Sequence, residues 1–335
     1  MIREAIEKAG KRIDLSADEM RACFEEIMSG EAASADIKAF LEALRKKGET
    51  VTEITDAALV MREKSVRIDA GSGLLDTCGT GGSGINTFNI STTAAFAAAG
   101  CGVKVAKHGN RSASCQCGSA DVLEALGVKI DIAPGRVAEC IKVVGIGFMF
   151  APVFHAAMKY AAVPRKELGG KTIFNILGPL SNPAGATHQV IGVYDAKLTE
   201  IMAGVLKNLG SKRAFVVCGA DGLDEITITE RTKISELDKG KVKTYYVAPE
   251  DFGAKKACLE DLKGASPKEN AEMVLAVLKG ERSARRDVVL ANAGASLVCV
   301  GKAEDFKTGF NLAAESVDSG RALDKLSKLA EFTNR

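Results

Sequence analysis

The sequence lacks an excess of charge of either sign. Its 45 Lys and Arg side chains stand against 43 Asp and Glu, which leaves a formal net charge of +2 at pH 7. Proteins held on nucleic acid or on anionic membranes usually carry a strong whole-molecule field, so this balance argues against both classes. Any anionic ligand must therefore be bound at a local site.

A long apolar run is also missing. The longest stretch, residues 143–154, is interrupted by Gly145, Gly147 and Pro152, and it is well short of the ~20 residues that span a bilayer. Residues 1–15 mix charges throughout and contain no apolar core of a secretory signal. These two absences predict a cytoplasmic protein without a membrane span.

Paired cysteine motifs are absent as well. The nine cysteines are scattered, and no C-x-x-C occurs. An odd number without such pairs fits neither a complete disulfide framework nor a zinc ribbon. Cys115 and Cys117 are close in sequence but have no second pair nearby, so an ordinary loop with reduced thiols is the better interpretation.

The length and composition predict a folded protein of about two domains. Apolar residues make up 46% of the 335 residues and charged residues 26%, which is ordinary globular composition and disfavours disorder, collagen-like repeats and a coiled coil. At roughly 150 residues per domain, the chain suggests two domains or one large domain with a smaller satellite.

The first 65 residues predict successive helices. Ser16 and Glu19 form a possible capping box, and apolar residues recur at helical spacing after it. A second helix follows Ser34, and a third follows Thr52. Each short helix buries one face, so three of them form a small helical unit that needs a partner surface to complete its core.

From about residue 74, short apolar runs alternate with helical segments, which is typical of an α/β sheet with crossover helices. The apolar runs are residues 74–75, 103–106, 148–150, 189–194 and 214–218. The helical segments between them include residues 92–99, 119–126, 136–144 and 197–209. Residues 227–247 predict a hairpin that turns at residues 238–240.

A glycine-rich loop follows the first predicted strand. Gly79, Gly81 and Gly84 meet the spacing G-x-G-x-x-G, but the next predicted strand leads into Lys107, where a dinucleotide-binding unit needs an acidic residue. No G-x-x-x-x-G-K-[ST] motif occurs. Exposed N–H groups, followed by small polar residues up to a helix near Ser91, favour a phosphate-bearing ligand. A flexible turn before a well-capped helix is the alternative.

A second loop suited to anions follows the second predicted strand. It contains residues 107–114 (KHGNRSAS), and Ser119 stands at the start of the next helix. Two strand-end loops on one edge of an α/β sheet form a ligand crevice. The alternative interpretation is a solvated basic turn.

An acidic turn, residues 221–225 (DGLDE), follows the predicted strand 214–218. Adjacent carboxylates repel one another unless a cation neutralises them, and Mg²⁺ prefers oxygen ligands together with substrate phosphates. A solvent-facing acidic turn is the alternative. Beside two phosphate-binding loops, magnesium is the better explanation.

The histidines and one arginine complete the candidates. His108, His155 and His188 are too scattered for a metal site, and we expect each to be packed or hydrogen-bonded rather than catalytic. Arg165 follows Pro164, which we expect to start a helix. Taken alone, that arginine would be a surface charge.

Five segments carry a specific pattern in order along the chain: residues 76–82 (DTCGTGG), 86–92 (NTFNIST), 107–111 (KHGNR), 118–127 (GSADVLEALG) and 172–180 (TIFNILGPL). Together with the helical segment 44–50 (LRKKGET), they resemble the anthranilate phosphoribosyltransferase family over nearly the whole chain. Five spaced motifs in the same order are too many for chance.

The resemblance implies both architecture and activity. It implies a small N-terminal helical domain, residues 1–70, completed by part of residues 160–185. The rest, residues 71–335, would form an α/β domain of the nucleoside phosphorylase and phosphoribosyltransferase type, with a central sheet flanked by helices that binds phosphoribosyl diphosphate. The family forms homodimers through the helical domain. It joins anthranilate to 5-phosphoribosyl 1-diphosphate with Mg²⁺, releasing pyrophosphate, in tryptophan biosynthesis.

The resemblance also implies roles for individual residues. The contacts to phosphoribosyl diphosphate would be Gly79, Gly82, Ser83, Thr87, Asn89, Ile90, Ser91, Thr92, Lys107 and Ser119. The magnesium ligands would be Ser91, Asp224 and Glu225. The contacts to anthranilate would be Gly79, Asn110 and Arg165, with His108, His155 and Pro179 lining its path. We expect no essential general base, because an aryl amine is neutral at pH 7; Lys107 and Arg165 supply charge and position instead.

The sequence departs from the family pattern at a few positions. Ser83 stands where Asp is usual, and Cys115, Gln116 and Cys117 stand where Ser, a basic residue and Ser are usual. Pro164 replaces Val, and Lys171 replaces Arg. The changes at residues 83 and 115–117 weaken side-chain contacts to phosphate or metal, whereas the backbone N–H donors are kept.

Three other functions are weighed against this one. A nucleoside phosphorylase shares the general fold, but Arg165 and the acidic pair at residues 224–225 argue against it. A non-catalytic nucleic-acid-binding relative should be basic, and the net charge of +2 is not. A dehydrogenase would bind a nicotinamide cofactor at the glycine-rich loop.

Overall fold

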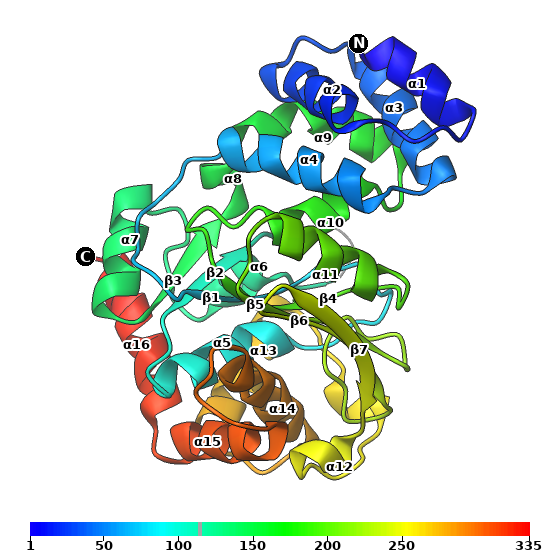
Figure 1. Ribbon diagram of the computed structural model, residues 1–335. Coiled ribbons are helices and arrows are strands. Elements are labelled where there is room, and N and C mark those ends of the chain that lie inside the picture. Colours follow the sequence, from blue (N-terminus) through cyan, green and yellow to red (C-terminus); the bar gives the residue numbers. More distant parts are fainter. Residues whose placement is uncertain (113–115) are drawn as a thin grey trace.

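The computed structural model describes residues 1–112 and 116–335. A small lobe of helices stands on a larger lobe built around one sheet, and the chain starts at the far end of the small lobe (Figure 1). The C-terminus lies on the outside of the large lobe, beside α7 (Pro134–Val143).

The small lobe contains four N-terminal helices and one later helix. These are α1 (Ile2–Gly10), α2 (Ala17–Ser29), α3 (Ser34–Lys47), α4 (Val51–Glu63) and α9 (Lys159–Leu168). Helix α9 packs against α2 and α3 (Figure 1). The capping box of Ser16 and Glu19 is confirmed, and Thr50 and Glu53 form a second box at the start of α4. Helix α1 was missed, since no side chain caps its start.

Pro164 lies inside α9, so the expectation that it starts a helix was wrong. The chain enters α9 earlier, through α8 (Ala151–Phe154) and the 3₁₀ turn η1 (Ala156–Met158). Proline lacks an N–H and removes one hydrogen bond from the helix interior. Pro164 is buried, and α9 packs against α2 and α3, so tertiary packing stabilises the helix despite the lost hydrogen bond.

The large lobe is organised by a seven-stranded sheet in the order β3-β2-β1-β4-β5-β6-β7. Its strands are β1 (Leu75–Gly79), β2 (Val105–Gly109), β3 (Ile146–Phe150), β4 (His188–Gly192), β5 (Arg213–Gly219), β6 (Thr232–Asp238) and β7 (Lys241–Val247). The first five are parallel, and β6 and β7 form the predicted antiparallel hairpin. Its turn contains Lys239 and Gly240 with φ of 48° and 76°.

Two strands extend further than the sequence predicted. Asp76 and Thr77 lie inside β1, and Lys107 and His108 lie inside β2, whereas all four were expected in loops. All four are buried. Parallel central strands are covered on both faces, so polar side chains in them must find partners inside the protein. The patterns of apolar residues end where these polar residues begin, although the strands continue.

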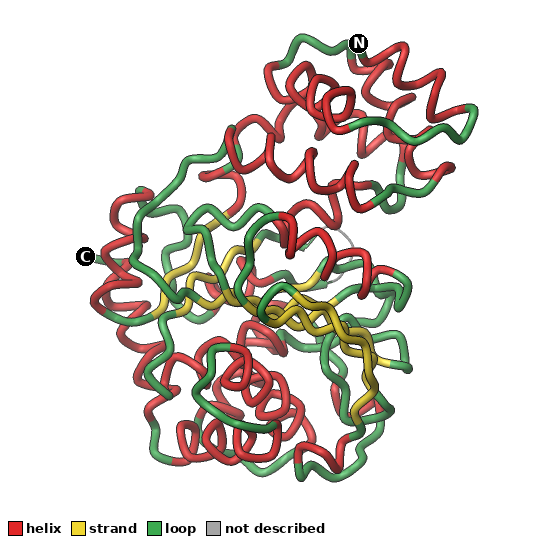
Figure 2. Tube along the Cα trace, in the orientation of Figure 1, coloured by secondary structure: helices red, strands yellow, loops and turns green. Residues whose placement is uncertain are grey.

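Helices cover both faces of the sheet (Figures 1 and 2). On the side of the small lobe lie α10 (Ile173–Leu180) and α11 (Leu198–Asn208). The other helices are α5 (Ile90–Gly100), α6 (Ser119–Ala125), α12 (Pro249–Phe252), the 3₁₀ turn η2 (Leu259–Leu262), α13 (Pro267–Leu278), α14 (Ala284–Cys299), α15 (Phe306–Asp318) and α16 (Arg321–Thr333). The predicted helices at α5, α6, α7 and α11 are confirmed; the sequence did not predict α12–α16.

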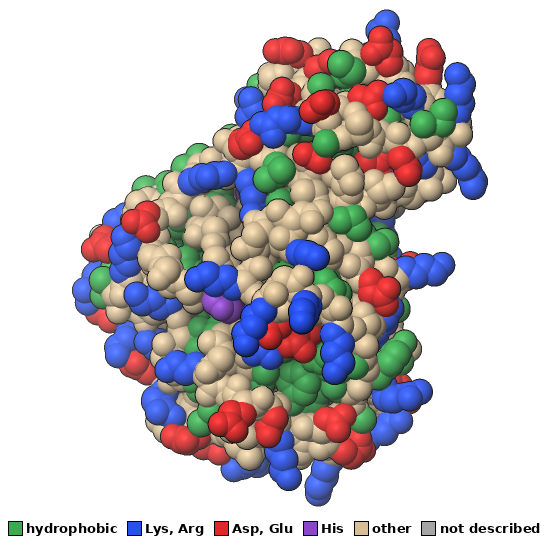
Figure 3. Space-filling view, in the orientation of Figure 1, with side chains coloured by type: hydrophobic (Ala, Val, Ile, Leu, Met, Phe, Trp, Pro, Cys, Tyr) green, Lys and Arg blue, Asp and Glu red, His purple; other side chains and the backbone are tan. Residues whose placement is uncertain are grey.

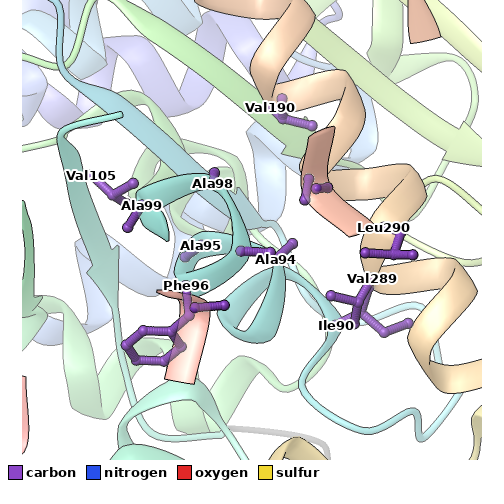
Figure 4. Packing of buried hydrophobic residues seen from close by; sticks show 14 of the residues in the cluster. Ile90, Ala94, Ala95, Phe96, Ala98, Ala99, Val105, Val190, Val289 and Leu290 are labelled. Atoms are coloured by element: carbon purple, nitrogen blue, oxygen red, sulfur yellow. The ribbon is translucent and has the colours of Figure 1, made fainter. Parts of the chain in front are cut away.

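Helix α5 is buried on all sides and packs closely against α14 (Figure 4). Its alanines, including Ala94 and Ala98, leave room for Val289 and Leu290 of α14 and for Val105 of β2. Small side chains let helix backbones approach closely. The start of α5 is therefore fixed in the core directly behind the glycine-rich loop.

The surface carries both signs of charge, interspersed over the face seen in Figure 3. Among the described residues, no helix combines the length and the apolar character needed to cross a membrane.

Glu53 provides a test of how the small lobe is held together. Its fully buried carboxylate accepts hydrogen bonds from Lys47 Nζ at 2.9 Å and from the backbone N–H groups of Leu15 and Thr50 at 2.8 Å each. Removing one partner of a buried ion pair costs about 3–5 kcal/mol. We predict that Glu53→Ala lowers the free energy of unfolding by about that amount in urea titrations.

The matched control is Glu42→Ala. Glu42 pairs with Lys46 on the same helix, and its side chain is 41% exposed, so its loss should leave the free energy of unfolding almost unchanged. Equal losses for the two variants would contradict the assignment of Glu53.

Candidate active site

The carboxyl ends of β1, β2, β4 and β5 lie at one edge of the sheet, because these strands are parallel neighbours. Three segments leave this edge. We call residues 79–89 the glycine loop, residues 109–112 with 116–118 the basic loop, and residues 220–226 the acidic loop.

The acidic loop is hydrogen-bonded to the glycine loop and to the start of α5. Asp224 Oδ2 accepts the backbone N–H of Gly81 at 3.0 Å, and Glu225 Oε1 accepts that of Ser91 at 3.2 Å. Ser91 lies in the first turn of α5, where N–H groups lack helical partners. Two carboxylates from one loop thus meet N–H donors from a segment far away in sequence.

Gly192, the last residue of β4, makes this approach possible. A Cβ atom at Gly192 would lie 1.6 Å from the carbonyl oxygen of Asp224, and one at Gly79 would lie 2.8 Å from Asp224 Oδ2. No side chain fits at Gly192 without moving the acidic loop. The sequence patterns did not assign Gly192 a role; a glycine at the end of a buried strand was the available signal.

The electrostatics of the acidic loop suit a cation. Burial and the neighbouring charge of Asp224 raise the pKa of Glu225 to about 8, with Lys107 opposing the shift. No ion pair joins either carboxylate to Lys or Arg within the described ranges. No three His, Cys, Asp or Glu side chains gather there as a ligand set either. Two carboxylates with the Ser91 hydroxyl fit Mg²⁺, which takes one or two carboxylates plus substrate phosphates.

Lys107 is a buried cation in β2, directly beneath this edge. Its Nζ donates a hydrogen bond to the carbonyl of Thr77 in β1. Burial lowers the pKa of Lys107, while the negative charges of Asp76 and Glu225 oppose the change. A positive charge is thereby held inside the sheet between the glycine loop and the basic loop.

Asp76 anchors the neighbouring backbone. Its carboxylate accepts the backbone N–H of His108 at 3.1 Å and Asn182 Nδ2 at 2.7 Å. Asn182 also donates to the carbonyl of Ala106 at 2.9 Å. Burial raises the pKa of Asp76 to about 6 despite Lys107. Asn182 was missed at the level of sequence, because it lies beyond the end of the motif at residues 172–180.

The side chain of Asn89 joins the glycine loop to the basic loop. Its Nδ2 donates to the carbonyl of Cys117 at 3.3 Å, and its Oδ1 accepts Asn270 Nδ2 at 3.0 Å. Asn270 is fully buried on α13. Ser119 Oγ donates to the carbonyl of Asn110 at 3.3 Å. Asn270 was missed, because a contact across such a sequence separation leaves no local pattern.

His108 and His155 lie together on the side of the site that faces α10. Their ring centroids are 5.0 Å apart and tilted by 45°. His108 Nδ1 lies 3.2 Å from the carbonyl of Gly178. Burial lowers the pKa of His108 to about 3 and that of His155 to about 4, so both rings are neutral at pH 7. The expectation that they are packed or hydrogen-bonded is confirmed for both.

Arg165 lies on α9 with its guanidinium 5.2 Å from the ring centroid of Phe174. Burial lowers its pKa, and no carboxylate pairs with it within the described residues. Arg165 is half-buried rather than a fully exposed surface charge, and its guanidinium lies toward Phe174 of α10. Pro179 lies inside α10, where its carbonyl accepts Gln189 Nε2 at 2.9 Å.

The other predicted residues lie along the glycine loop and the first turn of α5. Gly82 adopts φ of 79°, Ser83 Oγ accepts the N–H of Ile85, and Thr87 pairs with Lys263 in a β-bridge. Ile90 and Thr92 are buried in α5. Cys115 lies outside the described residues. Cys117 and the other described cysteines are free thiols.

Comparisons with known proteins agree along the whole chain. A family model described as glycosyl transferase family, a/b domain, matches residues 71–323, and one described as glycosyl transferase family, helical bundle domain, matches residues 3–65. The anthranilate phosphoribosyltransferase of Desulfosudis oleivorans is 55% identical over 335 residues, covering 99% of each chain. That of Geotalea uraniireducens is 53% identical over 349 residues, covering 100% of each.

Solved structures show the same relationship. The crystal structure of anthranilate phosphoribosyltransferase from Thermus thermophilus superposes with a TM-score of 0.94 at 42% identity and 99% coverage of both chains. The Saccharomyces cerevisiae enzyme in complex with PRPP and Mg has a TM-score of 0.91 at 28% identity, covering 99% of this chain and 98% of that one.

Gly192 gives a direct test of the assembled site. Because a Cβ there would overlap Asp224, we predict that Gly192→Ala displaces the acidic loop and lowers stability by about 1–3 kcal/mol. Activity should fall more than stability explains, which enzyme assays on the folded fraction can measure.

Gly204→Ala is the matched control. Gly204 lies in α11, where an added Cβ meets only Val51 at 3.6 Å, an ordinary contact. Normal activity in Gly192→Ala would show that the close approach is not needed.

Proposed function

Because this chain belongs to the anthranilate phosphoribosyltransferase family, we propose that its three loops carry out the transfer of a 5-phosphoribosyl group from 5-phosphoribosyl 1-diphosphate to the amine of anthranilate. The reaction releases pyrophosphate and serves tryptophan biosynthesis. The observation that carries the assignment of the site is the pair of hydrogen bonds that the backbone N–H groups of Gly81 and Ser91 donate to Asp224 and Glu225. It brings acidic groups for a cation beside the glycine loop and the start of α5.

The donor is held by the glycine loop, the start of α5 and the basic loop. The diphosphate lies along Gly79, Gly82 and Ser83, because the backbone N–H groups of a glycine-rich turn suit an anion. The remaining donor contacts are Thr87, Asn89, Ile90, Ser91, Thr92, Lys107 and Ser119. Ser119 starts α6 and supplies a further hydroxyl beside Asn110. Lys107 places its buried charge under the leaving group.

Mg²⁺ would be held by Ser91, Asp224 and Glu225. When bound, it supplies positive charge that neutralises the diphosphate as the glycosidic bond breaks. The raised pKa of Glu225, caused first by burial and then by Asp224, supports this proposal, since a half-buried pair of like charges is stabilised by a cation.

Anthranilate is positioned by Arg165 and Asn110. The guanidinium presents a planar fork of N–H donors that matches a carboxylate. Gly79, His108, His155 and Pro179 line its path. The two neutral imidazoles form an uncharged wall beside the aromatic ring.

No side chain is needed as a general base. The amine of anthranilate is neutral at pH 7, so its lone pair needs orientation rather than deprotonation, and its proton can leave after the new C–N bond forms. The low pKa values of His108 and His155, caused by burial, support this proposal because neither is poised to hold a proton near neutral pH.

The domain division and the assembly are also proposals. We infer a helical domain of residues 1–70 completed by part of residues 160–185, an α/β domain of residues 71–335, a homodimer through the helical domain, and a cytoplasmic location. The packing of α9 against α2 and α3 supports the shared helical domain.

The activity is tested by following the loss of anthranilate fluorescence with 5-phosphoribosyl 1-diphosphate and Mg²⁺. We expect loss only when both are present, together with release of pyrophosphate. Phosphorolysis of nucleosides without anthranilate consumption would support a nucleoside phosphorylase instead.

A variant of Arg165 tests whether this residue binds anthranilate rather than the phosphoribosyl donor. We predict that Arg165→Ala raises KM for anthranilate about 10–100-fold, because one or two charge-assisted hydrogen bonds to its carboxylate are lost. KM for the phosphoribosyl donor should stay nearly unchanged. The exposed neighbour Lys166→Ala is the control. Equal loss for both substrates would contradict the role of Arg165.

The acidic pair tests the metal site. Asp224→Asn combined with Glu225→Gln should shift the Mg²⁺ concentration for half-maximal activity upward by at least about 10-fold, because both charged ligands are lost. An unchanged activity with an unchanged magnesium requirement would show that the metal binds elsewhere.

A further inference from the structure

An open pocket of about 440 Å³ lies between the end of α3, the start of α10 and the segment after β4, next to the glycine loop. In Figure 1, α10 and α11 lie between the small lobe and the sheet. The polar lining residues are Arg45, Glu49, Lys171, Thr172 and Tyr194. The size is within the ~300–1,000 Å³ typical of ligand pockets.

Two of these residues touch the glycine loop. A Cβ atom at Gly82 would lie 3.0 Å from Lys171 Cε, so the lysine side chain lies directly against the loop. The backbone N–H of Tyr194 donates to Thr80 Oγ1 at 3.2 Å. The pocket therefore borders the same loop that the donor's diphosphate occupies in the proposed function.

Lys171 is a half-buried cation without a carboxylate partner. Its Nζ lies 3.6 Å from the ring centroid of Tyr194, and no carboxylate of the described chain is within 4.0 Å of it. A cation–π contact positions an ammonium but leaves its N–H donors available. A lysine restrained in this way can bind an anion at small entropic cost.

The other charged side chains that line the pocket are one cation, Arg45, and one acid, Glu49. Arg45 donates from Nη1 to the carbonyl of Gly169 at 2.9 Å, which orients its guanidinium near the start of α10. Glu49 is the single acidic group of the lining, and burial raises its pKa. Two cations against one carboxylate favour an anionic occupant.

We propose that Lys171, supported by Arg45, forms an additional binding position for diphosphate at the pocket side of the glycine loop. The proposal rests on the proposed function, which supplies diphosphate from two sources: the bound donor and the pyrophosphate that is released. Lys171 is a binding residue for the phosphate oxygens, and Glu49 opposes it by like charge.

The test measures pyrophosphate affinity by calorimetric titration at fixed Mg²⁺, and KM for each substrate, in Lys171→Met and Lys171→Arg. We expect Lys171→Met to weaken pyrophosphate binding about 10-fold and Lys171→Arg to restore it to within about 3-fold. KM for anthranilate should stay unchanged, which a merely structural defect would not allow. The exposed Lys207→Met is the control.

A second variant changes the opposite charge. Glu49→Gln should strengthen pyrophosphate binding, because it removes the opposing carboxylate. A rise in donor KM in Lys171→Met places the bound donor's diphosphate at this position, and a change confined to pyrophosphate places the released product there. Unchanged affinity for both in Lys171→Met overturns the proposal. Absence of transferase activity in the unmodified chain would instead overturn the proposed function.

Discussion

The site depends on the contact between two carboxylates and the N–H groups of a distant loop. Asp224 and Glu225 follow β5, whereas Gly81 and Ser91 follow β1, and β4 lies between these strands in the sheet. The acidic loop must therefore cross the end of β4, which is possible because Gly192 has no side chain. Without this crossing, acidic groups for a cation and N–H donors for phosphate would lie apart.

The rest of the large lobe keeps both partners of this contact in place. Asn292 of α14 accepts the N–H of Ile226 at 3.0 Å and donates to its carbonyl at 2.8 Å, directly after Glu225. On the other side, α5 is packed tightly by α14, so the first turn that carries Ser91 cannot shift easily. One helix thus supports both sides of the site, and preorganised groups of this kind are what stabilise charge in a transition state.

Much of the fold and of the candidate site was predictable from the sequence, and the features that were not predicted were missed for physical reasons. The parallel sheet, the hairpin predicted over residues 227–247 and the loops at the edge of the sheet follow from apolar runs and turn residues; the hairpin strands themselves begin at Thr232. The strands were predicted too short at Asp76 and Lys107, because buried polar residues break the apolar pattern. Inside the sheet, Asp76 accepts the backbone N–H of His108, and Lys107 donates to the carbonyl of Thr77. Contacts such as that of Asn270 with Asn89 join segments too distant for any local pattern to reveal.

The central claim is that the glycine loop and the acidic loop, at one edge of the sheet, together bind a phosphorylated sugar. The most direct measurement is a crystal structure of the chain with 5-phosphoribosyl 1-diphosphate and Mg²⁺. The account predicts the diphosphate between the glycine loop and Asp224, with the cation on Glu225. A sugar bound elsewhere, away from Lys107 and the acidic loop, would contradict it.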